Sequence, residues 1–174
     1  MRWLFALSAV SILGQTESPE PYTVSEAYEV YSAVLPDESR AERATTLVIR
    51  DEVVSYEMCL YPDEESKKII GPAIAHYQIV NRKRWRLQRD FHLQRTYELM
   101  PADKLAYVFS DPEAGRWIEL SAVGFNDAKT VAVVHIGHRA CGGRCAGGSF
   151  TVLEKKNGKW QPLRWKGSAC AWGS

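Results

Sequence analysis

The sequence lacks the motifs of several large enzyme classes. Its 174 residues contain no Gly-x-Ser-x-Gly elbow, no His-Glu-x-x-His helix and no P-loop, which removes the usual signatures of serine hydrolases, zinc proteases and nucleotide hydrolases. Internal repeats, low-complexity tracts and long runs of like charge are absent as well. The sequence therefore predicts no catalytic residue, no cofactor and no metal site of a recognised type.

An excess of charge of one sign is also missing. The chain has 22 basic and 21 acidic residues, a formal net charge of +1, so no overall field favours nucleic acid or an anionic membrane. Residues 81–90 form a local exception, with five basic residues around Trp85. A solvated face is the simpler interpretation of this segment, and binding of cell-surface polyanions is the alternative. We expect no nucleic-acid partner, and an unknown protein or small molecule as the ligand.

The first 14 residues have the layout of a secretory signal peptide. Arg2 supplies a positive charge, residues 3–13 form an apolar run, and Gly14 is a small residue before a polar segment. The run is too short for a stable membrane anchor, and no cysteine follows it to carry a lipid. A buried N-terminal helix or strand is the alternative. We predict a secreted or periplasmic protein without a transmembrane segment after cleavage.

The part of the chain after the predicted signal peptide is long enough to form one hydrophobic core. We interpret residues 15–22 as a flexible lead-in and residues 23–174 as a single α+β domain, because hydrophobic residues make up 45% of the chain and charged residues 25%. Helices are predicted from a capping box at Thr23 to Pro36, from Gly71-Pro72 onward, and briefly after Pro101.

The C-terminal part reads as a run of β-hairpins. Asn157-Gly158 is its strongest signal, because both central residues of a type I′ turn need positive φ. The expected fold is an antiparallel β-meander of about four to six strands with two or three helices packed on one face. Such a sheet can curl around a cavity, as in cystatin-like and NTF2-like folds. The strands are predicted over residues 45–49, 116–125, 129–138, 150–154 and 159–164.

Four cysteines make an even count in a chain that looks exported, which favours disulfides. Their positions are Cys59, Cys141, Cys145 and Cys170. The alternative is a thiol- or metal-dependent enzyme, or a hydrolase, that uses His135 and His138 together with the cysteines of the loop over residues 139–148. However, strand alternation points His135 to the face of Val131 and Val133, away from that loop.

Four cysteines allow three pairings. A regular hairpin extended from Asn157-Gly158 sets Cys145 opposite Cys170, whereas a turn centred on Gly143 sets Cys141 opposite Cys145. Such a turn places the Cα atoms of Cys141 and Cys145 within the separation of about 4.4–6.8 Å that disulfides need. We predict Cys141–Cys145 together with Cys59–Cys170.

The same loop carries two glycine pairs, residues 142–143 and 147–148, beside Arg139 and Arg144. Glycines next to arginines can form a nest that binds an anion. No helix follows them here, so glycines that allow tight positive-φ geometry are the simpler interpretation.

Three segments of the C-terminal third stand out together: residues 120–126 (LSAVGFN), 140–145 (ACGGRC) and 152–160 (VLEKKNGKW). With its VGFN, CGxxC and LEKKxGKW-type meander, the chain resembles a group of uncharacterised exported bacterial proteins. The resemblance implies export and an α+β fold, and it transfers no catalytic residue. Arg144 stands where the group leads us to expect an apolar residue, which predicts a more exposed loop.

Overall fold

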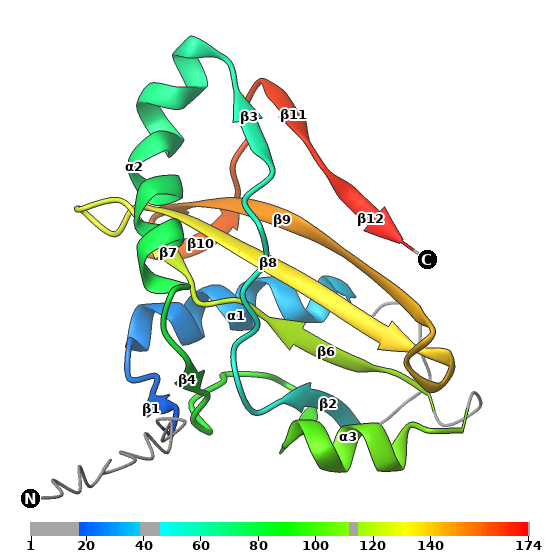
Figure 1. Cartoon of the computed structure of the whole chain (residues 1–174). Helices are drawn as coiled ribbons and strands as arrows, with labels where there is room; N and C mark the ends of the chain where they lie inside the picture. Colours follow the sequence, from blue (N-terminus) through cyan, green and yellow to red (C-terminus); the bar gives the residue numbers. More distant parts are fainter. Residues whose placement is uncertain (1–17, 39–45, 112–114, 174) are drawn as a thin grey trace, which may run out of the picture.

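The computed structural model describes residues 18–38, 46–111 and 115–173 (Figure 1). None of the helices in these ranges has the length and apolar character needed to cross a membrane. The predicted signal peptide lies outside the described residues. The elements, in chain order, are β1 (Glu20–Pro21), α1 (Ser25–Glu38), β2 (Thr46–Arg50), β3 (Leu60–Pro62), α2 (Glu64–Val80), β4 (Trp85–Arg86), β5 (Thr96–Met100), α3 (Ala102–Val108), β6 (Trp117–Leu120), β7 (Gly124–Phe125), β8 (Val131–Ala140), the 3-10 turn η2 (Cys141–Gly143), β9 (Cys145–Lys156), β10 (Lys159–Pro162), β11 (Gly167–Ala169) and β12 (Ala171–Gly173).

The central sheet is mixed, which corrects the predicted antiparallel meander. Its strand order is β10-β9-β8-β6-β2-β5, with β7 also on β8 and β12 also on β9. Strand β2 runs parallel to both β5 and β6, and the other pairs are antiparallel. Residue alternation identifies a strand but not its neighbour, so the parallel half of the sheet was not visible in the sequence. The class α+β is confirmed, and the structure does not confirm a cystatin-like or NTF2-like fold.

The helices cover both faces of the sheet, and the prediction that they pack on one face was wrong. Ala132 and Val134 of β8 pack in the cluster that contains α1, whereas Val131 and Val133 pack with α2. Helix α3 packs on Trp117, which strand pairing places on the α2 face. A strand that is buried on both faces of a sheet has a continuous run of apolar residues in its sequence, and β8 begins with such a run.

Helix α1 is fixed to the sheet by buried tyrosines. The rings of Tyr22, Tyr28 and Tyr31 are at most 1% exposed and contact one another. Tyr28 donates to the Tyr22 carbonyl oxygen and Tyr31 to the Ser121 carbonyl oxygen, each over 2.7 Å. The Tyr22 hydroxyl accepts from the Val123 amide at 3.0 Å. Each buried hydroxyl thus has a partner, as burial of a polar group requires.

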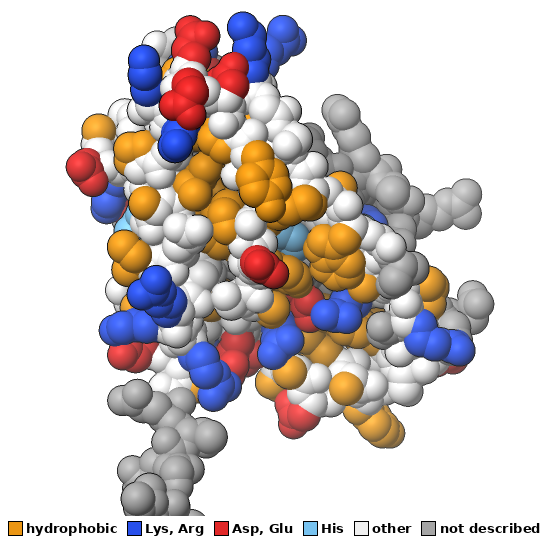
Figure 2. All heavy atoms as spheres, turned by 45° about the horizontal axis from the view of Figure 1, so that its top comes forward, with side chains coloured by type: hydrophobic (Ala, Val, Ile, Leu, Met, Phe, Trp, Pro, Cys, Tyr) orange, Lys and Arg blue, Asp and Glu red, His pale blue; other side chains and the backbone are white. Residues whose placement is uncertain are grey.

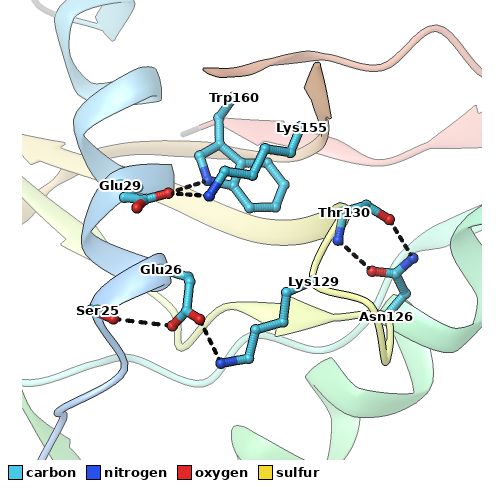
Figure 3. A network of polar contacts seen from close by, with 8 residues as sticks. All are labelled: Ser25, Glu26, Glu29, Asn126, Lys129, Thr130, Lys155 and Trp160. Atoms are coloured by element: carbon cyan, nitrogen blue, oxygen red, sulfur yellow. Dashed lines mark hydrogen bonds and ion pairs between the residues drawn. The ribbon is translucent and has the colours of Figure 1, made fainter. Parts of the chain in front are cut away.

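Polar contacts at the solvent side of α1 complete this attachment (Figure 3). Glu29 accepts hydrogen bonds from Lys155 at 2.7 Å and from the Trp160 indole at 3.0 Å. Glu26 pairs with Lys129 at 2.7 Å, in the turn before β8. Two successive turns of α1 are therefore connected to two different hairpins.

Helix α2 starts earlier than the sequence predicted. Asp63 caps it by accepting a hydrogen bond from the Ser66 amide at 2.8 Å, and the helix continues through Pro72. Pro36 likewise lies inside α1, although it was expected to end that helix. Pro72 removes one backbone hydrogen bond without ending α2, because packing of the apolar face of this helix outweighs that loss.

The Asn157-Gly158 turn is confirmed. Both residues have positive φ, 51° and 76°, and Lys156 pairs with Lys159 across the turn. After β10 the chain leaves β9, pairs β11 with β3, and returns as β12 beside the first part of β9. This detour brings the C-terminal segment next to the segment that precedes β3.

Candidate functional site

The structure places the four cysteines in two disulfides. Cys141, the first residue of η2, is bonded to Cys145, the first residue of β9, with the two Cα atoms 5.3 Å apart. Cys59 and Cys170 are joined with a Cα separation of 5.5 Å, where the Cys170 amide also donates to the Cys59 carbonyl oxygen at 3.1 Å. None of the four is a free thiol.

The histidines near this loop do not gather around it. His135 lies on the α2 face of β8, and His138, three residues on, lies on the α1 face. Within the described ranges, no three His, Cys, Asp or Glu side chains are placed to hold a metal ion together. The strand ends at Ala140, so only residues 141–144 connect β8 to β9, a shorter loop than the one predicted over residues 139–148.

A different cluster forms on the α2 face, around a buried carboxylate. The Glu119 side chain is 3% exposed and lies in the middle of β6. Its Oε2 accepts from the Tyr56 hydroxyl at 2.7 Å and from Arg139 Nε at 3.0 Å. Its Oε1 accepts from Arg50 Nη1 and from the Trp117 indole, each at 3.4 Å.

Strand order explains why these residues meet. Arg50 ends β2, Glu119 lies in β6 and Arg139 lies near the end of β8, and these three strands are neighbours. Ile49 pairs with Ile118 and Glu119 pairs with Gly137, so the three charged residues project from the same face. Tyr56 reaches them from the segment between β2 and β3, which crosses in front of the sheet in Figure 1.

The surroundings of Glu119 keep it ionised. Burial raises the pKa of this carboxyl, but the hydrogen bonds from Tyr56 and Arg139 and the positive charges of Arg139 and Arg50 outweigh burial and place the pKa below its usual value. The pKa of Tyr56 is raised far above its usual value, first by burial and then by the negative charge of Glu119. At neutral pH the pair is therefore a carboxylate that accepts from a neutral phenol.

The cluster opens into a cavity of about 260 Å³ between the sheet and α3. Arg50 and Arg139 line it with side chains that are 29% and 37% exposed, and the walls are otherwise mostly apolar. Gly142 of η2 also lines the cavity; a Cβ on this residue would lie 2.7 Å from the Ser110 carbonyl oxygen, so the loop fits tightly against the residues that follow α3. The apolar walls are formed by Ala102, Leu105, Ala106, Phe109 and Trp117.

An aromatic stack borders the cluster. The Tyr56 ring stacks on His135 with centroids 3.7 Å apart, and the partly exposed Trp172 lies parallel to His135 at 6.5 Å. Gly137 and Gly148 leave room for these rings, because a Cβ on either residue would lie 2.6 Å or less from Tyr56 or His135. The His135 ring is 1% exposed and its Nδ1 has no partner among the described residues. Burial lowers the pKa of His135 to about 4.

The basic segment over residues 81–90 is partly neutralised. Arg84 and Arg86 pair with Glu52 at 2.9 and 3.7 Å, and Lys83 pairs with Glu20 at 3.7 Å. Figure 2 shows basic side chains beside hydrophobic ones on one face of the molecule, with a histidine visible among them.

Sequence reasoning missed Glu119, Arg50 and Arg139 as a group. The available signal was a single carboxylate between apolar residues of a strand, in Trp117-Ile-Glu-Leu120. Comparison with protein-family models, curated proteins and solved structures finds no match to this chain. What the fold and the site define is a disulfide-stabilised α+β domain with a buried carboxylate between two arginines.

Proposed function

We propose that this protein is an exported binding domain and that the cavity beside Glu119 is its ligand site. The observation that carries this proposal is the cavity itself, where two partly exposed arginines meet apolar walls above a buried carboxylate. Ligand sites typically combine an apolar lining with a few fixed polar groups that orient the ligand. Here Glu119 holds both guanidinium groups in place before any ligand arrives.

The chemistry of the cluster supports binding more than catalysis. A general base works best with a pKa near the operating pH, and the pKa of Glu119 is lowered instead. Its two oxygens already accept from four donors. The cysteines, which were the other candidate nucleophiles, are held in disulfides.

Export is supported by two features. The apolar run of residues 3–13 follows a positive charge, and the cysteines are paired. Disulfides persist in oxidising compartments, which include the periplasm and the extracellular space. Intact-mass measurement of material secreted by a bacterial host is expected to give a chain that starts near Gln15. A full-length product retained in the cytoplasm would contradict export.

Binding is tested with three small aromatic probes of similar size and different charge: phenylacetate, phenylacetamide and phenethylamine. Titration followed by tryptophan fluorescence and calorimetry is expected to detect at least one of them. The control is Ala106→Phe, which is expected to fill the cavity from α3 and which replaces none of Arg50, Glu119 and Arg139. Binding that persists in this variant, or no binding of any probe to the native protein, would show that the cavity is not a ligand site.

A further inference from the structure

The two arginines have more hydrogen-bond donors than Glu119 can use. Each guanidinium carries five N–H donors. Glu119 accepts from Nε of Arg139 and from Nη1 of Arg50. Among the described residues neither arginine has a second carboxylate partner, and Nε of Arg50 is buried without any partner. Counted together, the three side chains carry a net charge of about +1.

The unused donors belong to the side chains that a ligand would reach first. Arg50 and Arg139 are about one-third exposed and line the cavity, whereas Glu119 is 3% exposed beneath them. An incoming anion would therefore meet guanidinium groups before it meets the carboxylate. A planar guanidinium matches the two oxygens of a carboxylate with two parallel hydrogen bonds.

The rest of the cavity favours an apolar group attached to that anion. Leu105, Phe109 and Trp117 are 1%, 6% and 7% exposed and present apolar surface on the α3 side. A volume of about 260 Å³ lies just below the range of roughly 300–1,000 Å³ that is common for drug-sized ligands. One aromatic ring or a short aliphatic chain is the size that fits. A single net positive charge also matches a monoanion better than a doubly charged phosphate ester.

From these observations we infer that the cavity binds a small monocarboxylate with an apolar body, its carboxylate on Arg50 and Arg139 and its body against Leu105, Phe109 and Trp117. This inference rests on the proposed function, since it names the ligand class of the same cavity. Tyr56 and Glu119 act as positioning residues that fix the two arginines.

The test compares phenylacetate with its neutral analogue phenylacetamide on the full mature chain. Phenylacetate is expected to bind at least about tenfold more tightly, because only its carboxylate makes charge-assisted hydrogen bonds. Arg139→Gln and Arg50→Gln are each expected to reduce phenylacetate affinity by about tenfold and to remove the preference over the amide. Arg86→Gln, which removes a surface ion pair outside the cavity, is the matched control and should leave both affinities unchanged.

Two further measurements keep the outcomes distinct. Thermal unfolding shows whether each variant is folded. Ala106→Phe is expected to block the cavity and replaces neither arginine, so it applies even where Arg139→Gln does not fold. If phenylacetamide or phenethylamine binds as tightly as phenylacetate or more tightly, and Ala106→Phe abolishes this binding, the inferred ligand class is wrong. The proposal that the cavity binds a ligand would then still hold. Binding of phenylacetate that survives Ala106→Phe, or no binding of any probe, would overturn both.

Discussion

The Tyr56 hydroxyl donates a hydrogen bond of 2.7 Å to the carboxylate of Glu119, across 63 positions of sequence, from a segment without regular secondary structure. The same ring stacks on His135. One side chain therefore connects the segment between β2 and β3 to both β6 and β8. Because Glu119 also accepts hydrogen bonds from Arg50 and Arg139, which line the cavity, the stability of the fold and the geometry of the site depend on the same carboxylate.

Replacement of Glu119 by Gln is expected to lower the free energy of unfolding by about 2 kcal/mol, the scale of hydrogen bonds to charged groups. The Gln amide nitrogen would face donors from Tyr56 or the arginines, and both guanidinium groups would lose their counter-charge. Urea denaturation measures the change. The matched control is Glu98→Gln, which breaks an exposed pair with Lys104 and should cost less than about 1 kcal/mol. Equal effects of the two substitutions would contradict the role given to Glu119.

A fall in pH below about 6.5 is expected to destabilise the protein through His135. Burial lowers the pKa of His135 from 6.5 to about 4, so between these values the unfolded chain binds a proton that the folded chain excludes. Stability should fall as the pH drops through this window, by on the order of 3 kcal/mol in total. Glu119, whose pKa is also lowered in the folded state, adds a loss at lower pH, as its carboxylate is protonated.

Replacement of His135 by Phe should reduce the decrease in the free energy of unfolding between about pH 6.5 and 4. The substitution keeps an aromatic ring against Tyr56. Urea denaturation at a series of pH values gives the slope. Phe150→Leu serves as the control, because it alters a ring that contacts His135 without removing a titrating group. An unchanged slope in His135→Phe would mean that another group dominates the acid response.

The hairpin turn at Asn157-Gly158 offers a test of register. Gly158 has φ of 76° with open space around its Cα, so any cost of a side chain there comes from the backbone. Gly158→Val is expected to destabilise by about 1–2 kcal/mol. Gly158→Asn, which tolerates the left-handed region, should cost clearly less. A melting temperature for the Val variant equal to that of the native protein would argue against this turn geometry in solution.

The two disulfides should differ in their contribution to stability. Cys59–Cys170 spans a sequence separation of 111 and Cys141–Cys145 one of 4. Chain-entropy arguments give about 5 kcal/mol for the long loop and about 2 kcal/mol for the short one. Double Ser variants, compared by urea denaturation, are expected to follow this order. Non-reducing peptide mapping of the native chain provides the direct check, and a peptide that joins Cys145 to Cys170 would refute the pairing.

Local features of the fold were predictable from sequence, whereas relations between distant strands were not. Positive φ at Asn157-Gly158 follows from two adjacent residue types, and β-branching between residues 45 and 49 was enough to predict β2. Strand order depends on which apolar faces pack together, and alternation gives no information about that. The parallel pairing of β2 with its neighbours and the placement of α1 and α2 on opposite faces are relations of this kind, so the sequence did not predict them.

The candidate site was hidden for the same reason. Glu119 meets Arg50 across 69 positions and Arg139 across 20, and each is an ordinary strand residue by itself. The alternative that set Cys145 opposite Cys170 along one regular hairpin does not occur in the structure, which has the predicted pairs Cys141–Cys145 and Cys59–Cys170. After Pro162 the chain pairs β11 with β3 and returns with a shifted register, in which Ala171 lies opposite Ser149.

The bond between Cys59 and Cys170 makes most of this chain a covalent ring. A protease that cuts one peptide bond anywhere between these two residues opens the ring without releasing a fragment. The nicked protein keeps its mass apart from one added water, and its two pieces stay at high effective concentration and can re-form the sheet. In a compartment rich in proteases, single cuts in the loops around the cavity would therefore leave the chain assembled until a reductant separates the halves.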